Sequence, residues 1–183
     1  MVNLKAKPFN LSDEDIKWVK DTIADMTIEE KIGQLFVNMG ASRDEEYLKG
    51  MLNDYHIGAV RYNPATAEQV YDQNKILQEN SKIPLLIAAN TEGGGNGACI
   101  DGTYVANQVK IGATNDPKYA YELGRVSGVE AAAIGCNWSF APVVDIDMNW
   151  RNPVISSRCY SNKAEQVLEF SLEYMRGIME SGI

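Results

Sequence analysis

Two polar segments of the chain contain the residue types best suited to binding a ligand. Residues 90–98, with the sequence NTEGGGNGA, place the amide of Asn90 and the carboxylate of Glu92 ahead of glycines, which allow a ligand to approach the backbone. Residues 140–160 contain Asp145 and Arg158, whose planar guanidinium suits a pair of hydroxyl groups or a carboxylate. Because carboxylates and amides also share hydrogen bonds with hydroxyl groups, the two segments predict a ligand rich in hydroxyls.

Simpler roles for the same residues remain open. Residues 90–98 are also compatible with a tight turn that needs positive φ angles. Asp145 is equally suited to holding the neighbouring loop in place. Arg158 can pair with Asp145 or Asp147 and staple its own loop without touching a ligand.

A dinucleotide site is a further alternative for the first segment. Gly93, Gly95 and Ala98 satisfy the pattern G-x-G-x-x-A after an apolar run. However, Glu92 would place a negative charge beside the pyrophosphate, and the following residues, interrupted by Gly102, do not begin a regular helix. We therefore rank this alternative below hydroxyl binding.

Composition excludes several other classes of function. The chain has 17 basic and 25 acidic residues, a net charge of −8, which disfavours nucleic acid as a partner. No apolar run is long enough to span a membrane. Three cysteines without metal-ligand spacing and a single histidine argue against a metal site, and we expect no cofactor. The cysteines favour reduced thiols in a cytoplasmic protein.

The polar segments lie between elements that alternate regularly along the chain. Capping residues predict helices beginning after Ser12, Thr27, Thr66 and Asn162. Short apolar strands are expected in residues 33–40, 57–63, 84–90 and 136–145, and long loops follow the last two. Strands that are apolar on both faces and alternate with helices predict an α/β protein with a parallel sheet.

Four such units fit either an open doubly wound sheet or part of a (β/α)₈ TIM-type barrel. A complete barrel normally needs about 250 residues and eight units, so the four βα units after amino-terminal helices would be its first half. We expect one domain over residues 1–183 and no second domain. The first and last strands would then be unpaired edges, which predicts self-association.

Four segments in order resemble the amino-terminal barrel domain of family-3 glycoside hydrolases, which include β-glucosidases and β-N-acetylhexosaminidases. They are MTIEEKIGQLF, PLLIAANTEGG, GVEAAAIGCNWSFAPVVDID and NPVISSRCYSN, and the resemblance covers residues 26–183. It implies retaining hydrolysis of terminal β-linked sugars through a covalent glycosyl-enzyme intermediate. It also implies that the nucleophile and the acid/base lie beyond Ile183, so that no catalytic residue is expected within this chain and the fragment alone should be inactive.

The same resemblance assigns sugar-binding roles. Arg158 matches the family's sugar-binding arginine, Asn90 occupies the place of a sugar-binding aspartate, and Glu92 and Asp145 match acidic positions of the same loops. Within the family, the expected absence of a signal peptide and of a second domain favours an intracellular, β-N-acetylhexosaminidase-like member with a carbohydrate substrate. A non-catalytic sugar-binding module is the alternative from another class.

Overall fold

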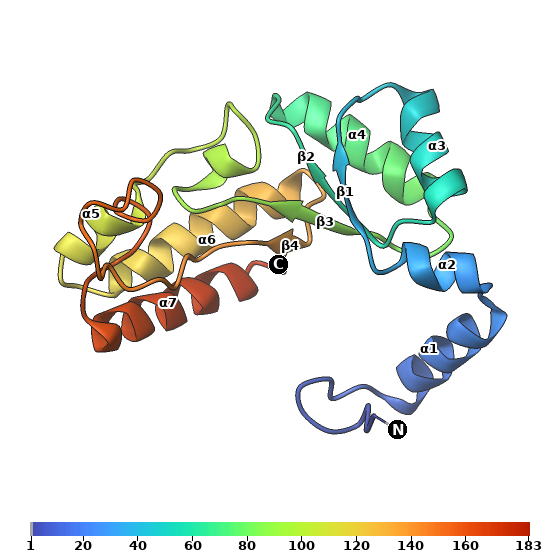
Figure 1. Ribbon diagram of the computed structural model, residues 1–183, viewed down its shortest axis with the longest axis horizontal. Helices are drawn as coiled ribbons and strands as arrows, with labels where there is room; N and C mark the ends of the chain where they lie inside the picture. The colour runs from blue at the N-terminus through green and yellow to red at the C-terminus, as the bar shows by residue number, and fades with distance from the viewer. Residues whose placement is uncertain (1) are drawn as a thin grey trace.

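Four short apolar strands form one parallel sheet in the computed structural model, which describes residues 2–183. The strands are β1 (Val37–Gly40), β2 (Ala59–Tyr62), β3 (Leu86–Ala89) and β4 (Trp138–Ser139), and they lie in the order β1-β2-β3-β4 (Figure 1). A doubly wound sheet would reverse its order at a switch point, whereas consecutive strands are neighbours in a barrel. The order therefore confirms the predicted barrel type, of which four strands are half.

Every predicted strand is present but shorter than its apolar segment. The largest difference is in residues 136–145, where only Trp138 and Ser139 pair with β3. Beyond Ser139 the backbone leaves the sheet, and Phe140 makes one last hydrogen bond from its N–H to the carbonyl of Ala89. The prediction of a ten-residue strand was wrong, because the apolar residues after Ser139 belong to the following loop and not to the sheet.

Helices connect the strands and cover one face of the sheet. The main helices are α3 (Glu45–Tyr55), α4 (Ala67–Asn80), α6 (Lys118–Ala133) and α7 (Ala164–Met179). Val60, Ile87 and Leu48 are fully buried in a core between the strands and α3 and α4. A second core, which includes Leu123 and Phe170, joins α6, α7 and the short α5 (Gln108–Ala113).

Local capping predicted most of the helix starts correctly. Ser12, Thr27 and Thr66 form capping boxes at α1 (Asp13–Asp25), α2 (Ile28–Gly33) and α4. The prediction that Asn162 caps the last helix was wrong, because α7 begins at Ala164 with Lys163 as its N-cap. Ser161 Oγ accepts a hydrogen bond from the Lys163 N–H, so a turn formed by Ser161 fixes the chain just before the helix.

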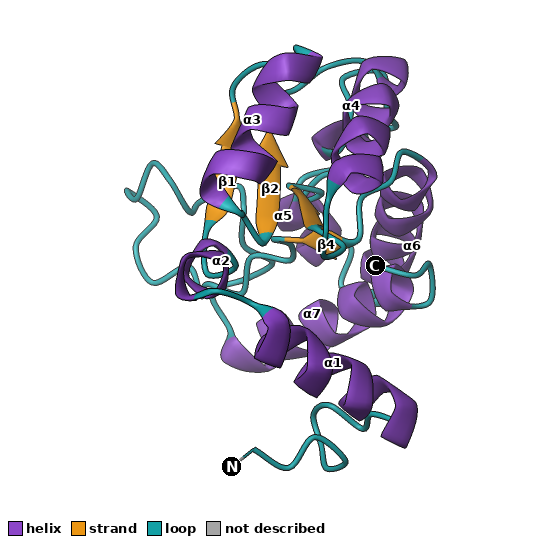
Figure 2. Ribbon diagram, turned by 90° about the vertical axis from the view of Figure 1, so that its right-hand side faces the viewer, coloured by secondary structure: helices purple, strands orange, loops and turns teal. Residues whose placement is uncertain are grey.

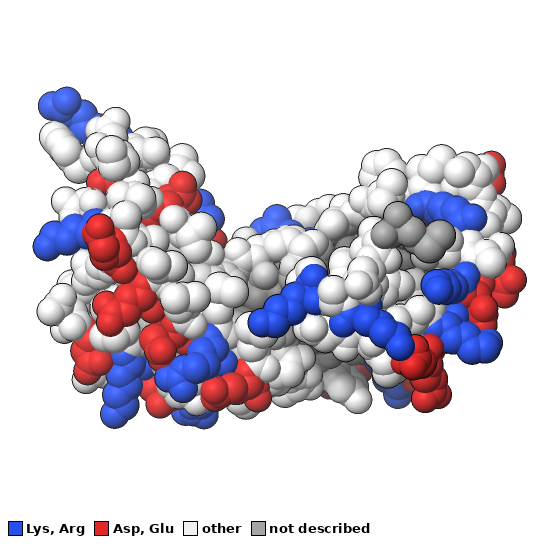
Figure 3. Space-filling view, turned by 90° about the horizontal axis from the view of Figure 1, so that it is seen from below, with Lys and Arg blue, Asp and Glu red and all other residues white. Residues whose placement is uncertain are grey.

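The other face of the sheet is uncovered in residues 2–183. Side chains alternate across a strand, so Val37, Met39 and Leu86 point away from the helices. They are 46%, 41% and 50% exposed, although their positions within a parallel sheet would normally be buried. Helix α1 stands apart from the sheet in Figure 1, lies at the lower end of the molecule near the amino terminus in Figure 2, and buries none of its residues. Figure 3 shows a broad hollow between two lobes, with few charged side chains on its floor.

Candidate sugar-binding site

The two polar loops lie at the same edge of the sheet. The segment from Asn90 follows β3, and the segment from Phe140 follows the neighbouring strand β4. Because β3 and β4 are parallel, both loops leave the sheet at its carboxyl-terminal edge, where ligands bind in barrels. The pairing of these strands therefore brings together residues that are more than 60 positions apart in the sequence.

Glu92 and Arg158 form a bidentate ion pair between the two loops. Arg158 Nε donates to Glu92 Oε2 at 2.8 Å, and Nη2 donates to Oε1 at 2.7 Å. The carboxylate raises the pKa of the Arg158 guanidinium through these hydrogen bonds and its charge, and Asp145 adds to the effect by its charge. The alternative that Arg158 pairs with Asp145 or Asp147 was wrong, because its ion-pair partner is Glu92.

This ion pair is open to solvent. The side chains of Arg158 and Glu92 are 42% and 24% exposed. The fork uses Nε and Nη2 of Arg158, and no hydrogen bond from Nη1 occurs within residues 2–183. Since a guanidinium has five N–H donors, Arg158 can hold Glu92 and still donate to a ligand hydroxyl.

Asn90 lies beside this ion pair in the sequence but lines a cavity of its own. The cavity has a volume of about 200 Å³ at the carboxyl ends of β2 and β3, and Arg61, Ala88 and Asn96 also line it. Arg158 and Asp145 are not among its lining residues. The structure therefore places all four predicted residues on one edge of the sheet, and it joins Glu92 directly to Arg158.

Thr91 anchors the first loop to strand β4 and helix α7. Its Oγ1 lies 2.9 Å from Tyr174 Oη on α7 and 2.8 Å from Ser139 Oγ on β4. Tyr174 Oη also donates to the Thr91 carbonyl at 2.8 Å. Thr91 and Tyr174 are fully buried, so this network fixes the backbone between Asn90 and Glu92.

The glycines of the first loop form a tight turn, as the simpler alternative predicted. Gly94 has φ = +134°, a conformation that other residues rarely adopt. The turn leads into η1, a 3₁₀-helix of only three residues (Gly95–Gly97). A dinucleotide fingerprint needs a longer helix whose amino terminus faces the pyrophosphate, so this geometry does not fit that alternative.

Several residues that support the loops were not recognised from the sequence. The carboxylate of Glu130 on α6 accepts hydrogen bonds from the N–H and hydroxyl of Thr103. Gln108 donates to the Val143 carbonyl and accepts from the Val143 N–H, which links the two long loops. Gln108 belongs to α5, a short helix inside a segment predicted to be loop. The cap at Asn107 was the available signal for it, since Asn107 accepts a hydrogen bond from the Lys110 N–H.

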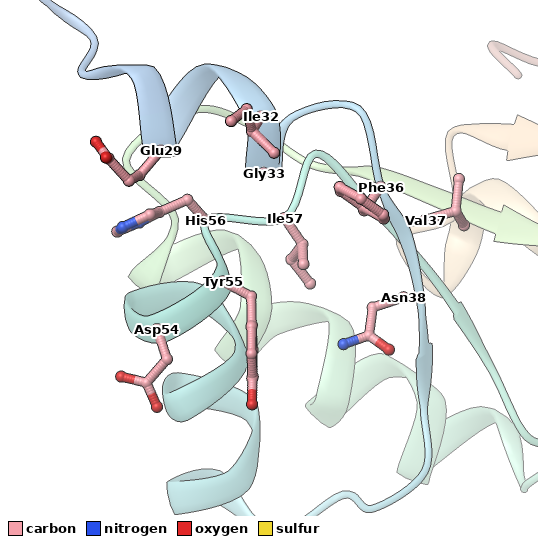
Figure 4. A pocket seen from close by; sticks show the side chains of 10 residues that line it. All are labelled: Glu29, Ile32, Gly33, Phe36, Val37, Asn38, Asp54, Tyr55, His56 and Ile57. Atoms are coloured by element: carbon pink, nitrogen blue, oxygen red, sulfur yellow. The ribbon is translucent and has the colours of Figure 1, made fainter.

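A larger cavity lies near the amino-terminal end of β1, opposite the loops. It has a volume of about 450 Å³, and Phe36, Val37, Tyr55 and Ile57 line it together with His56 (Figure 4). His56 has positive φ at the end of α3 and belongs to this face. The single histidine therefore lies away from the carboxyl-terminal edge of the sheet, where barrels bind their ligands.

The described residues include no group of histidine, cysteine and acidic side chains that could hold a metal ion. Cys99, Cys136 and Cys159 are buried free thiols. None of the helices in the described part of the chain combines the length and apolarity needed to cross a bilayer.

Residues 27–183 match the model of the glycosyl hydrolase family 3 N terminal domain. The chain belongs to this family. The match confirms the resemblance in the four sequence segments, and it identifies the four-stranded sheet as part of a family 3 barrel domain.

Relatives of this family 3 domain extend over its whole length. The chain is 38% identical over 183 residues to a β-N-acetylglucosaminidase/β-glucosidase from Cellulomonas fimi, covering 100% of this chain and 32% of that protein. A solved structure of the β-glucoside phosphorylase BglX bound to 2FGlc superposes with a TM-score of 0.93 and 39% identity, over 98% of this chain and 33% of that one. A family 3 β-N-acetylglucosaminidase from Paenibacillus sp. gives a TM-score of 0.78 and 32% identity, over 86% of this chain and 32% of that one. The family 3 domain described here thus spans about a third of the length of these relatives.

Cys99 lines the Asn90 cavity and provides a pH-dependent test of how well the cavity excludes water. Burial is the main cause that raises the pKa of the Cys99 thiol from 9.0 to about 11, and the nearby Asp101 side chain adds to the shift. The folded protein then holds this proton in the range from pH 9 to 11 while the unfolded chain releases it, so stability should fall as the pH rises through that range. We expect denaturant midpoints to decrease less steeply over this range for Cys99→Ala than for the unsubstituted protein. Equal slopes in the two proteins would contradict a buried, protonated Cys99.

Proposed function

We propose that the full-length protein hydrolyses terminal β-linked sugars with retention of configuration and that this chain supplies part of the sugar-binding site. The observation that carries the proposal is the Glu92–Arg158 ion pair, which joins the strand-end loops of a family 3 domain and presents partly exposed donors and acceptors. Such an arrangement can bind neighbouring hydroxyls of a pyranose ring. The nucleophile and acid/base come from the remainder of the protein.

The substrate in this proposal is a β-N-acetylglucosaminide or a β-glucoside. The names of the relatives from Cellulomonas fimi and Paenibacillus sp. support a β-N-acetylglucosaminide, and the name of the Cellulomonas fimi relative also supports a β-glucoside. Asn90 contributes a neutral hydrogen bond to a sugar hydroxyl, whereas an aspartate would contribute a charged one, which is stronger by ~1 kcal/mol. Glu92 and Asp145 supply the negative charges at the same edge of the sheet.

The test is an assay of the full-length protein with nitrophenyl β-N-acetylglucosaminide and nitrophenyl β-glucoside, with the anomer of the first product followed by NMR. We expect turnover of at least one substrate and release of the β-anomer. Release of the α-anomer, or no turnover of either glycoside, would contradict the proposal, and the second result would favour a non-catalytic sugar-binding module. Enzyme-like turnover by the isolated 183-residue chain would show that a nucleophile had been missed within it.

Phosphorolysis is a second candidate reaction. It is favoured by the high structural similarity, with a TM-score of 0.93, to a protein described as a β-glucoside phosphorylase. In that reaction phosphate takes the place of water and the product is a sugar 1-phosphate. Mass spectrometry of products formed in phosphate buffer and in a phosphate-free buffer distinguishes the two reactions.

We also propose that the isolated chain self-associates through its free sheet edges. Strands β1 and β4 each have a neighbour on only one side within residues 2–183, and Leu35 and Phe36 beside β1 are 83% and 59% exposed. Unpaired strand edges with exposed apolar side chains favour pairing with another chain. Light scattering of the isolated 183-residue chain should show dimers or larger species, whereas a monodisperse monomer would contradict this proposal.

A cytoplasmic location is part of the same proposal, and nucleic acid is not proposed as a partner. The three free thiols support a reducing compartment. The net charge of −8 disfavours binding to nucleic acid. Fractionation of the source cells with an antibody to the protein tests the location.

A further inference from the structure

Arg61 is the only charged residue in the four strands. It is the penultimate residue of β2 and pairs in register with Met39 on β1 and Ala88 on β3. Its neighbours Val60 and Tyr62 are buried in the core on the helix side of the sheet. Because side chains alternate along a strand, Arg61 lies on the opposite, inner face, which is otherwise apolar around it.

The charge of Arg61 has no counter-ion within residues 2–183. No carboxylate oxygen lies within 4.0 Å of its guanidinium, whereas Arg158 is held by both oxygens of Glu92. Arg61 is also partly buried. A partly desolvated cation without an anionic partner is unfavourable, so its place in the sheet indicates that an anion is supplied from elsewhere.

The cavity beside Arg61 has the size and lining for a small anion. Its volume of about 200 Å³ is below the roughly 300–1,000 Å³ of sites that enclose whole drug-sized ligands. The amide side chains of Asn90 and Asn96 line it and can donate N–H groups, and none of its lining residues is acidic. A pocket with one guanidinium, two amides and no carboxylate is chemically complementary to an oxyanion.

The walls of this cavity are held rigidly. Tyr62 Oη donates to the Ala98 carbonyl at 2.8 Å, and the Ile100 N–H donates to the Ala65 carbonyl at 2.8 Å. These bonds tie the loop after β3 to the end of β2. The cavity therefore exists before any ligand binds, which reduces the entropic cost of binding.

We propose that Arg61, Asn90 and Asn96 form an oxyanion-binding site at the carboxyl ends of β2 and β3, which accepts a phosphate or carboxylate group. The anion is either a free ion in the pocket or a group borne by the sugar itself. This proposal goes beyond glycoside cleavage, because it adds a binding site for negative charge that shares only Asn90 with the proposed sugar-binding residues.

The experiment is calorimetric titration of the full-length protein with inorganic phosphate, glucose 6-phosphate and glucose. We expect phosphate or glucose 6-phosphate to bind, with a Kd at least tenfold higher for Arg61→Gln and an intermediate value for Arg61→Lys, which retains the charge but not the planar fork. The matched control is Arg125→Gln, which removes the same charge from an arginine paired with Glu122 on the surface of α6 and should leave the Kd unchanged. Preference for free phosphate or for glucose 6-phosphate identifies the source of the anion.

Three results would overturn the proposal. The first is equal affinity of Arg61→Gln and Arg125→Gln for the anion that the unsubstituted protein binds. The second is no binding of inorganic phosphate together with equal affinity of the unsubstituted protein for glucose and glucose 6-phosphate. The third is absence of binding of either anion at millimolar concentration, and a melting temperature lowered by several degrees in Arg61→Gln would then indicate that a carboxylate from the rest of the protein pairs with Arg61. Because these measurements need no turnover, they can fail or succeed independently of the proposed glycoside cleavage.

Discussion

Replacement of Arg158 by alanine in the full-length protein is expected to lower kcat/KM for a nitrophenyl β-glycoside by about 100-fold. Hydrogen bonds to charged groups contribute about 1.5–3 kcal/mol each, and two such bonds also hold the Glu92 carboxylate in position. The substitution removes the donors that we propose bind the sugar, and it leaves Glu92 with an unpaired charge. Arg158→Lys should recover part of the activity, because an ammonium group retains the charge but cannot form the bidentate contact.

Arg151→Ala is the matched control for this effect. Arg151 lies in the same loop, but its guanidinium carbon lies 4.6 Å from the centroid of the Trp150 ring, and it forms no ion pair with a carboxylate in residues 2–183. Its replacement should change kcat/KM by less than about threefold, in line with the small effects of most surface substitutions. Unchanged kinetics in Arg158→Ala, accompanied by a lower melting temperature, would mean that Arg158 holds the two loops together and does not bind the substrate.

Replacement of Gly97 by alanine is expected to destabilise the protein by about 3 kcal/mol, at the upper end of the usual cost of overpacking. A Cβ atom at position 97 would lie 1.8 Å from the Asn90 carbonyl oxygen and 2.9 Å from the Thr91 Cα. Both are backbone atoms, so no side-chain rotation can relieve the clash. The strand end at Asn90 must move, which should also raise KM for the glycoside.

Gly40→Ala provides the comparison for this substitution. The nearest atom to a Cβ at position 40 is Val60 Cγ1 at 3.5 Å, which is an ordinary van der Waals distance. Urea unfolding of the two variants and the unsubstituted protein measures the difference. Equal midpoints for Gly97→Ala and Gly40→Ala would show that the loop after β3 is more adaptable than its hydrogen bonds imply.

Local sequence chemistry was sufficient to predict most elements of this fold, though not the short helix α5. The Thr27–Glu30 capping box and the Thr66 cap form within a few residues, so they depend little on the rest of the protein. Positive φ at Gly94 follows from the same kind of local constraint. The prediction failed at Asn162, where a turn at Ser161 fixes the chain before α7, and in residues 136–145, where the backbone leaves the sheet after Ser139.

The sequence by itself determined the α/β class, the family resemblance and the two loops that bear Asn90, Glu92, Asp145 and Arg158. Only the tertiary structure decided that Arg158 pairs with Glu92 and not with Asp145 or Asp147. The reason is that Asp145 and Asp147 are near Arg158 along the chain, whereas the parallel pairing of β3 with β4 brings Glu92 to it from 66 residues away. The pairing of β2 with β3 likewise places Arg61 beside Asn90, a proximity that no local pattern encodes.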